Sequence, residues 1–114
     1  LKGGDLEEAI SRLRKAVEIN PDYLDAWYNL TTAYIRAGRY EDALSTCREV
    51  VRRNPGYRDG ELFKDLAMIY RRLGDRDRAR EAMARYRQYV NRKKVQEVVR
   101  EIKSRMFPYV VREP

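Results

Sequence analysis

Few side chains in this sequence could carry out chemistry on a substrate. The chain contains no histidine, which removes the residue that most often serves as a general base or a metal ligand. Its single cysteine, Cys47, falls among apolar residues at helical spacing, and we expect it to be a small buried side chain. The acidic pairs Glu7-Glu8 and Glu41-Asp42 stand at expected helix starts, where carboxylates interact favourably with the helix dipole. We therefore predict that the chain is not an enzyme and uses no metal or cofactor.

The charged side chains offer binding chemistry instead. The chain of 114 residues has 25 Lys and Arg and 18 Asp and Glu, a formal net charge of +7. Residues 1–57 are neutral overall, so the whole excess lies in residues 58–114, with the densest basic run from Arg71 to Lys94. We expect the arginines of that run to be split between helix faces: Arg76, Arg78, Arg80 and Arg87. A solvated basic surface is the simplest interpretation, and an acidic partner is the next.

Apolar residues recur at steps of three and four along most of the chain, a spacing typical of amphipathic helices. It predicts helices over residues 5–19, 23–37, 40–53 and 59–73, and a further helix from residue 75. Pro21 and Pro55 end two of them, because the residue before a proline is driven out of the helical conformation. Gly38 and Gly74 end two others, since glycine readily adopts the positive φ of a helix C-terminus.

The last helical stretch has two interpretations. No proline follows Asp75 before Pro108, so the helix either breaks near Asn91 or continues unbroken. Its second part has an apolar side that consists of Val95, Val98, Val99, Ile102 and Met106. No stretch of the chain approaches the roughly 20 apolar residues that span a bilayer.

An internal repeat organises these helices. One offset of thirty-four residues separates three pairs of like residues: Pro21 and Pro55, Gly4 and Gly38, Ala9 and Ala43. Helical units that repeat in this way stack into an extended surface and have no built-in catalytic pocket.

The repeat resembles the tetratricopeptide repeat, a helix-turn-helix unit. The complete repeat matches the family pattern at Trp27, Leu30, Tyr34, Gly38, Tyr40, Ala43, Cys47, Val50 and Pro55. The segment before it matches the second half of the pattern, and the segment after it matches with two extra residues within 55–60. The resemblance implies an all-α, right-handed solenoid of helical hairpins, with about 2.5 repeats and a C-terminal capping helix.

On this pattern the chain divides into a partial repeat over residues 1–21, a complete repeat over 22–55 and a third repeat over 56–91. Residues 92–107 are expected to form the capping helix, and residues 108–114 an extended tail. Four large aromatic residues are expected in the core: Trp27, Tyr34, Phe63 and Tyr70.

Stacked hairpins curve, and the first helix of each pair lines the concave side. Residues of that helix that do not point into the core are the candidates for partner contact. In the complete repeat they are Asp25, Tyr28, Asn29, Thr32, Ile35 and Arg36, and in the third repeat Glu61, Lys64, Asp65, Met68, Arg71 and Arg72. Three of them, Tyr28, Ile35 and Met68, are expected to be exposed apolar residues, which a purely solvated helix face does not need.

The expected function is a protein-interaction scaffold that binds a peptide or protein, of unknown identity, in this groove. The first alternative is self-assembly into a homo-oligomer, since the first repeat lacks its leading helix and would leave these residues partly uncovered: Leu6, Ile10, Leu13 and Val17. The second is electrostatic binding of an acidic partner or nucleic acid by the basic C-terminal half. Nucleic acid ranks last, because no nucleic-acid motif is present.

The expected location is the cytoplasm, because a lone cysteine permits a reducing compartment. The chain opens at Leu1 inside the repeat, so this expectation allows for a targeting segment before it.

Overall fold

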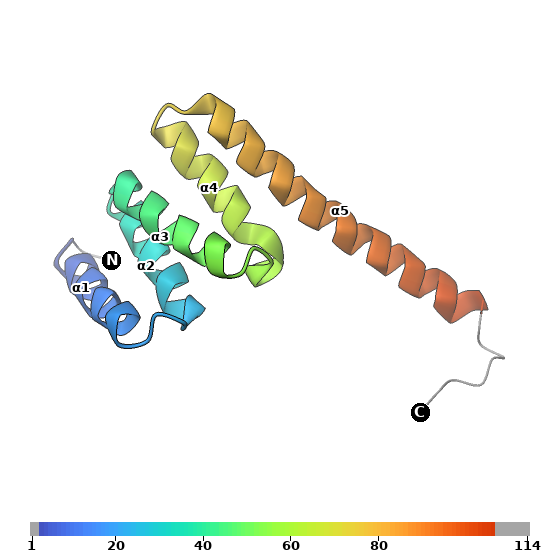
Figure 1. The fold of residues 1–114 in the computed structure, drawn as a ribbon, viewed down its shortest axis with the longest axis horizontal. Coiled ribbons are helices and arrows are strands. Elements are labelled where there is room, and N and C mark those ends of the chain that lie inside the picture. Colours follow the sequence, from blue (N-terminus) through green and yellow to red (C-terminus); the bar gives the residue numbers. More distant parts are fainter. Residues whose placement is uncertain (1–2, 107–114) are drawn as a thin grey trace.

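The computed structural model of this chain describes residues 3–106, which form five α-helices and one short 3-10 helix without any strand. They are α1 (Gly3–Ile19), α2 (Leu24–Arg36), α3 (Tyr40–Arg53), η1 (Tyr57–Gly60), α4 (Glu61–Arg72) and α5 (Arg76–Met106). Each helix packs against the next one along the chain, and the second half of α5 projects beyond the stack (Figure 1). The expected all-α stack of helical hairpins is confirmed.

Two glycines end the first helices of the hairpins as predicted. Gly38 has a φ of +72°. Its N–H donates to the carbonyl of Ile35 at 3.0 Å, and the N–H of Arg39 donates to the carbonyl of Tyr34 at 2.9 Å. This pair of bonds is a Schellman motif, which satisfies the last carbonyls of a helix. Gly74, with a φ of +83°, closes α4 by the same pattern.

The two inserted residues build a separate turn before α4. Arg58, Asp59 and Gly60 follow one another with φ of 51°, 57° and 78°, so this turn is locally left-handed. Such a conformation is unfavourable for residues with a side chain. A Cβ on residue 60 would also collide with the ring of Tyr89 in α5, so glycine is required there by both space and φ.

The core lies between successive helices and confirms most of the expected interior. Ala43 and Cys47 of α3 have no exposed surface, and Phe63 and Tyr34 are buried. Trp27 and Tyr70 were expected in the core but are only half-buried, with their rings packed against its edge. The Nε1 of the Trp27 indole donates to the carbonyl of Pro21 at 2.7 Å, a bond that lies at the exposed edge of the molecule.

We expected four apolar residues of α1 to be partly uncovered: Leu6, Ile10, Leu13 and Val17. This prediction is wrong for two of them. Ile10 and Val17 are buried, because α1 turns that side toward α2. Leu6 and Leu13 are half-buried. The apolar surface that α1 offers for self-assembly is therefore smaller than expected.

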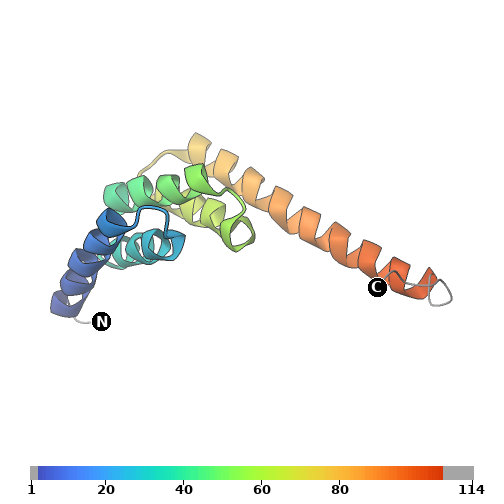
Figure 2. The same cartoon turned by 60° about the horizontal axis from the view of Figure 1, so that its bottom comes forward.

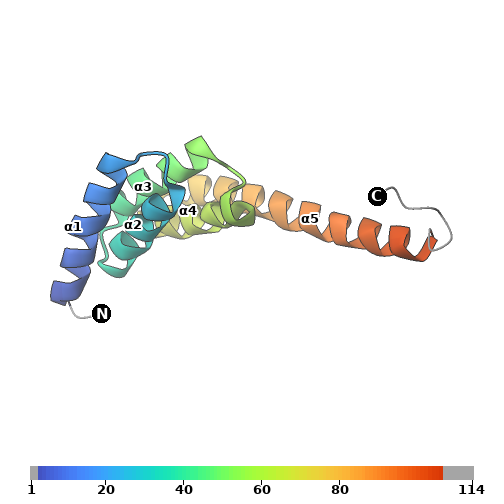
Figure 3. The same cartoon turned by 90° about the horizontal axis from the view of Figure 1, so that it is seen from below.

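Of the two interpretations of the last helical stretch, the structure shows the continuous one. α5 is a single helix of 31 residues, and residues 92–106 are its second half rather than the separate capping helix that we expected. Every residue from 91 to 106 is exposed, so this half does not cover the end of the stack. Figures 2 and 3 show the projection from two further sides. The tail over residues 108–114 lies outside the described residues, and the division into repeats at 21/22 and 55/56 stays a prediction.

Candidate protein-interaction surface

The twelve predicted contact residues lie on α2 and α4, and we call their surface the α2–α4 face. Asp25, Asn29 and Arg36 are exposed on α2, and Lys64 and Arg71 on α4. The remaining exposed residue is Arg72, whose guanidinium lies over the ring of Tyr40 at 5.9 Å. The half-buried members are Tyr28, Thr32, Ile35, Glu61, Asp65 and Met68.

Tyr28, Ile35 and Met68 were expected to be exposed, and the structure corrects this. All three are half-buried and pack against the edge of the core. The reason is that α2 and α4 each contact a neighbouring helix, so apolar side chains on the shoulder of a helix reach its neighbour. Each side chain nonetheless keeps part of its surface open to a ligand.

The inserted turn brings the starts of α2 and α4 together. The hydroxyl of Tyr57 donates to the carboxylate of Asp25, and the rings of Tyr57 and Tyr28 lie 6.1 Å apart at a tilt of 59°. The guanidinium of Arg58 lies 4.4 Å from the centre of the Tyr28 ring, and its Nε is 3.3 Å from a carboxylate oxygen of Glu61. Arg58 therefore connects the two helices across the face.

Sequence reasoning missed Tyr57 and Arg58, because both belong to the insertion that the family pattern does not contain. The only signal was the presence of a large aromatic residue in a segment otherwise rich in turn residues. Burial raises the pKa of Tyr57 to about 12, and its bond to the Asp25 carboxylate acts in the same direction. Tyr57 thus remains a hydrogen-bond donor at neutral pH.

Asp65 is one of two half-buried acids of the face, the other being Glu61. Burial raises the pKa of its carboxyl group above the usual range, and the nearby carboxylate of Glu61 adds to the effect, while Lys64 and Arg58 oppose it. A carboxylate that is partly withdrawn from water beside another acid is costly to the fold. Groups of this kind occur preferentially at functional sites.

The charges of the face change sign along the helices. The starts of α2 and α4 lie together, as the contact between Tyr57 and Asp25 shows. Arg72 at the end of α4 lies over Tyr40, which follows the end of α2, so the two helices run in the same direction. The acidic members lie toward the starts: Asp25, Glu61 and Asp65. The basic Lys64 lies among them, and the other basic members lie at the ends: Arg36, Arg71 and Arg72. A ligand on this face would therefore meet mixed charge with an acidic excess at the starts, and basic charge alone at the ends.

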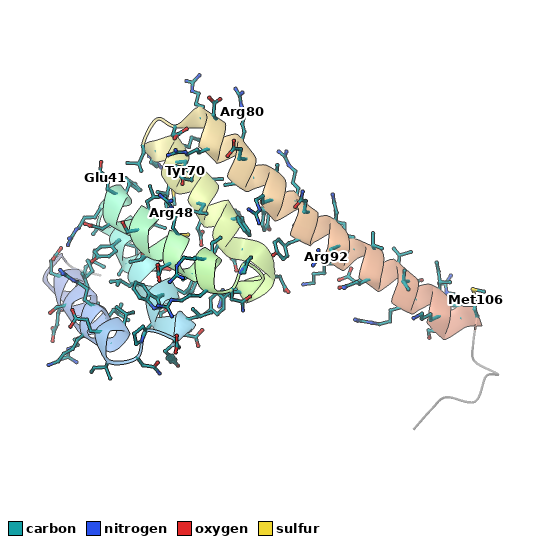
Figure 4. All side chains as sticks on the ribbon, viewed as in Figure 1. Glu41, Arg48, Tyr70, Arg80, Arg92 and Met106 are labelled. Atoms are coloured by element: carbon teal, nitrogen blue, oxygen red, sulfur yellow. The ribbon has the colours of Figure 1, made fainter. Side chains whose placement is uncertain are left out.

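A cleft of about 630 Å³ lies outside the predicted face, between α3, α4 and α5. Phe63 and Leu66 supply part of its apolar lining, and the guanidinium of Arg85 lies 4.7 Å from the centre of the Phe63 ring. Arg48 of α3 and Tyr70 of α4 face the same space from two helices (Figure 4). No motif in the sequence indicated this cleft, because its lining comes from three helices.

A second cleft, of about 500 Å³, corrects part of our expectation that four arginines of α5 are split between helix faces. Its lining contains Ala79 and Met83 and four arginines: Arg71, Arg76, Arg80 and Arg87. Three of the four arginines that we expected to be split are therefore gathered on one side of α5. Their spacing by four and seven residues keeps them on one face of an unbroken helix, whereas Arg78 lines the first cleft.

Cys47 confirms its predicted structural role. Its thiol is fully buried, its Sγ donates to the carbonyl of Leu62 at 3.4 Å, and burial raises its pKa well above the ordinary value. Such a thiol is inert as a nucleophile at neutral pH. Among residues 3–106, no helix is both long enough and apolar enough to cross a membrane.

Comparison with known proteins agrees with this architecture. Two crystal structures of MamA have similar folds. The first superposes with a TM-score of 0.73 at 23% sequence identity and covers 79% of this chain and 52% of that one. The second has a TM-score of 0.68 at 21% identity and covers 96% of this chain and 52% of that one. At this identity the likeness concerns the fold alone.

Sequence comparison supports the same assignment. The uncharacterized protein MJ0572 of Methanocaldococcus jannaschii is 50% identical over 36 residues, which are 32% of this chain and 42% of that protein. The chain therefore spans less than half of the length of that relative. The sequence model of the tetratricopeptide repeat matches residues 1–61 and again residues 37–102. This chain belongs to the tetratricopeptide-repeat family.

Proposed function

We propose that the chain is a protein-interaction scaffold whose α2–α4 face binds a peptide segment of a partner protein. Tetratricopeptide-repeat folds serve in general as interaction modules, which supports the broad assignment. The observation that carries the choice of surface is Asp65, a half-buried acid with a raised pKa, next to the Tyr28–Arg58 contact. An arrangement that costs the fold stability is more readily understood if a ligand compensates it.

The charges of the face suggest the chemistry of the segment. A basic group would meet the acidic starts of α2 and α4, and an acidic group would meet Arg36, Arg71 and Arg72. Between them, apolar side chains would contact the open edges of Ile35 and Met68. Helix α2 has 13 residues, a length of about 20 Å, which an extended peptide of roughly six residues would span.

The test uses blocking substitutions at exposed positions, because these leave the core contacts intact. Peptides that bind the full chain are selected from a random library, and their affinities are measured by isothermal titration calorimetry. Asn29→Trp and Lys64→Trp place a large ring on the face and should each lower affinity by about tenfold or more. Ser11→Trp, an equally exposed substitution on α1, should leave affinity unchanged.

Circular dichroism melting of all three variants checks that the fold is kept. If the selected peptides bind Asn29→Trp and Lys64→Trp as well as they bind the parent chain, the α2–α4 face is not the binding surface.

A further inference from the structure

The second half of α5 carries an apolar stripe that nothing in the described chain covers. It consists of Val95, Val98, Val99, Ile102 and Met106, whose exposed fractions range from 42% to 65%. Their spacing by three and four residues places them along one side of the helix. Figure 4 shows Met106 near the tip of the projecting helix and Arg92 near the point where it leaves the stack.

The stripe faces away from the helical stack. The first half of α5 packs on the stack through a side that includes the half-buried Tyr86 and Tyr89. Val95 follows Tyr86 by nine residues, and Val98 follows Tyr89 by nine, which is about 2.5 turns and therefore the opposite side of the helix. The stripe is thus not a continuation of the surface that packs on α4.

The residues on both shoulders of the stripe are basic. At 100° per residue, Arg92 and Lys103 flank it on one side, and Lys94 and Arg105 on the other. Of the two acidic residues in this half, Glu97 lies on the opposite side of the helix. Glu101 lies on the second shoulder and pairs with Arg105 at 2.8 Å, so among the described residues Lys94 is the unneutralised cation there. One shoulder continues toward the stack at intervals of seven residues, through Arg87 and Arg80.

We propose that this stripe binds an acidic amphipathic helix of a partner protein. The apolar side of such a helix would pack on the valines and Ile102, and its carboxylates would meet the basic shoulders. β-Branched side chains are well suited to packing between two helices. This surface is separate from the α2–α4 face, so the chain would hold two partners at once.

The composition of the stripe favours this occupant over two others. A second copy of the chain would bring basic shoulders against basic shoulders, which is unfavourable. Helices that lie on a membrane surface usually insert Trp, Phe or Leu, and the stripe has only Val, Ile and Met.

The test measures binding of the full chain to two fluorescent synthetic helices. Both have about three heptads with Leu at the a and d positions, and they carry either Glu or Lys at the e and g positions. In low salt, the Glu helix should bind about tenfold more tightly than the Lys helix. Lys94→Glu combined with Lys103→Glu should reverse this preference.

A matched pair of variants locates the site. Ile102→Asp and Ser104→Asp add the same charge at exposed positions two residues apart, but Ser104 lies away from the stripe. Ile102→Asp should lower affinity for the Glu helix by about tenfold or more, and Ser104→Asp should leave it nearly unchanged. Asn29→Trp on the α2–α4 face should have no effect, so failure here is distinguishable from failure of the proposed function.

Four results would overturn the proposal. The first is equal weakening by Ile102→Asp and Ser104→Asp, and the second is equal affinity for the Glu and Lys helices. The third is binding to vesicles of phosphatidylglycerol and phosphatidylcholine that Ile102→Asp abolishes, without binding to the Glu helix. The fourth is a dimer in sedimentation equilibrium that Ile102→Asp dissociates.

Discussion

The ring of Tyr89 in α5 stacks on the ring of Phe63 in α4, with the ring centres 5.8 Å apart and the planes inclined by 20°. The same tyrosine ring occupies the space where a side chain on residue 60 would have to lie. Tyr89 therefore joins α5 to both α4 and the inserted turn. Beyond this contact the side chain of Lys93 still pairs with Asp59 at 3.5 Å, and then α5 leaves the stack.

This contact predicts that Gly60→Ala is strongly destabilising. The new methyl group would both displace the Tyr89 ring and strain a residue at positive φ, so we expect a loss of about 2 kcal/mol or more in the free energy of unfolding. Gly38→Ala is the matched control, since Gly38 has a similar φ but open space around it, and it should cost about 1 kcal/mol. Urea unfolding followed by circular dichroism measures both. Equal losses would show that the collision with Tyr89 is relieved at no cost.

The raised pKa of Asp65 predicts a pH-dependent gain from Asp65→Asn. Because the folded chain holds this proton more tightly than the unfolded chain, stability falls as the pH rises from the ordinary Asp value, about 3.9, through the raised value. Asparagine cannot ionise, so the variant should be more stable than the parent chain at neutral pH, and this gain should disappear below about pH 4.

Urea unfolding between acidic and neutral pH tests the Asp65 prediction. Glu97→Gln, at an exposed position of α5, is the control and should show no such gain. A stability difference between Asp65→Asn and the parent chain that stays constant with pH would contradict the assigned cause.

Tyr57→Phe should weaken the contact that holds the starts of α2 and α4 together. The substitution removes the hydrogen bond to Asp25 and keeps the ring that packs on Tyr28, so we expect a loss of about 1 kcal/mol in unfolding free energy. Tyr23→Phe, which removes a hydroxyl from an exposed ring, should cost nearly nothing. If the two variants have the same stability, the contact between Tyr57 and Asp25 does not hold the turn in place.

The exposed half of α5 should exchange its amide hydrogens rapidly. Residues 95–106 have no packing partner in the described chain, so local opening there does not disrupt the core. Hydrogen exchange followed by mass spectrometry should show exchange at least about tenfold faster in peptides from this region than in peptides covering residues 79–90. Addition of the Glu helix should slow exchange in residues 95–106 and leave residues 79–90 unchanged. Equal protection in the free chain would mean that the stripe is already covered.

Local sequence predicted the helices well where a local signal decides the structure. Gly38 and Gly74 end their helices by bonds between neighbouring backbone groups, and these bonds need only a residue that tolerates positive φ. The small residues Ala43 and Cys47 are buried as expected, because their positions follow from the repeat itself. The predicted contact residues on α2 and α4 are all exposed or half-buried, although Tyr28, Ile35 and Met68 are less exposed than expected. Their role in binding stays a prediction.

The end of the chain was harder to predict for a physical reason. The apolar side of α5 changes from one face to the opposite face near Asn91, and such a change of phase is compatible with a break or with one straight helix. Periodicity cannot distinguish them, because it reports which residues share a face and not whether the backbone bonds continue. The structure shows continuity, because α5 runs unbroken from Arg76 to Met106.

The sequence by itself determined the helical hairpins, the approximate extents of the first four helices and the small-residue core, because these depend on spacing and on the conformational freedom of single residues. Only the tertiary structure decided how the inserted turn packs, with Arg58 over Tyr28 and Gly60 beneath Tyr89. It also decided that the stripe from Val95 to Met106 points away from the stack. The packing of the turn depends on contacts between residues far apart in the chain, which no local pattern encodes. The direction of the stripe depends on whether the helix continues past Asn91, which periodicity leaves open.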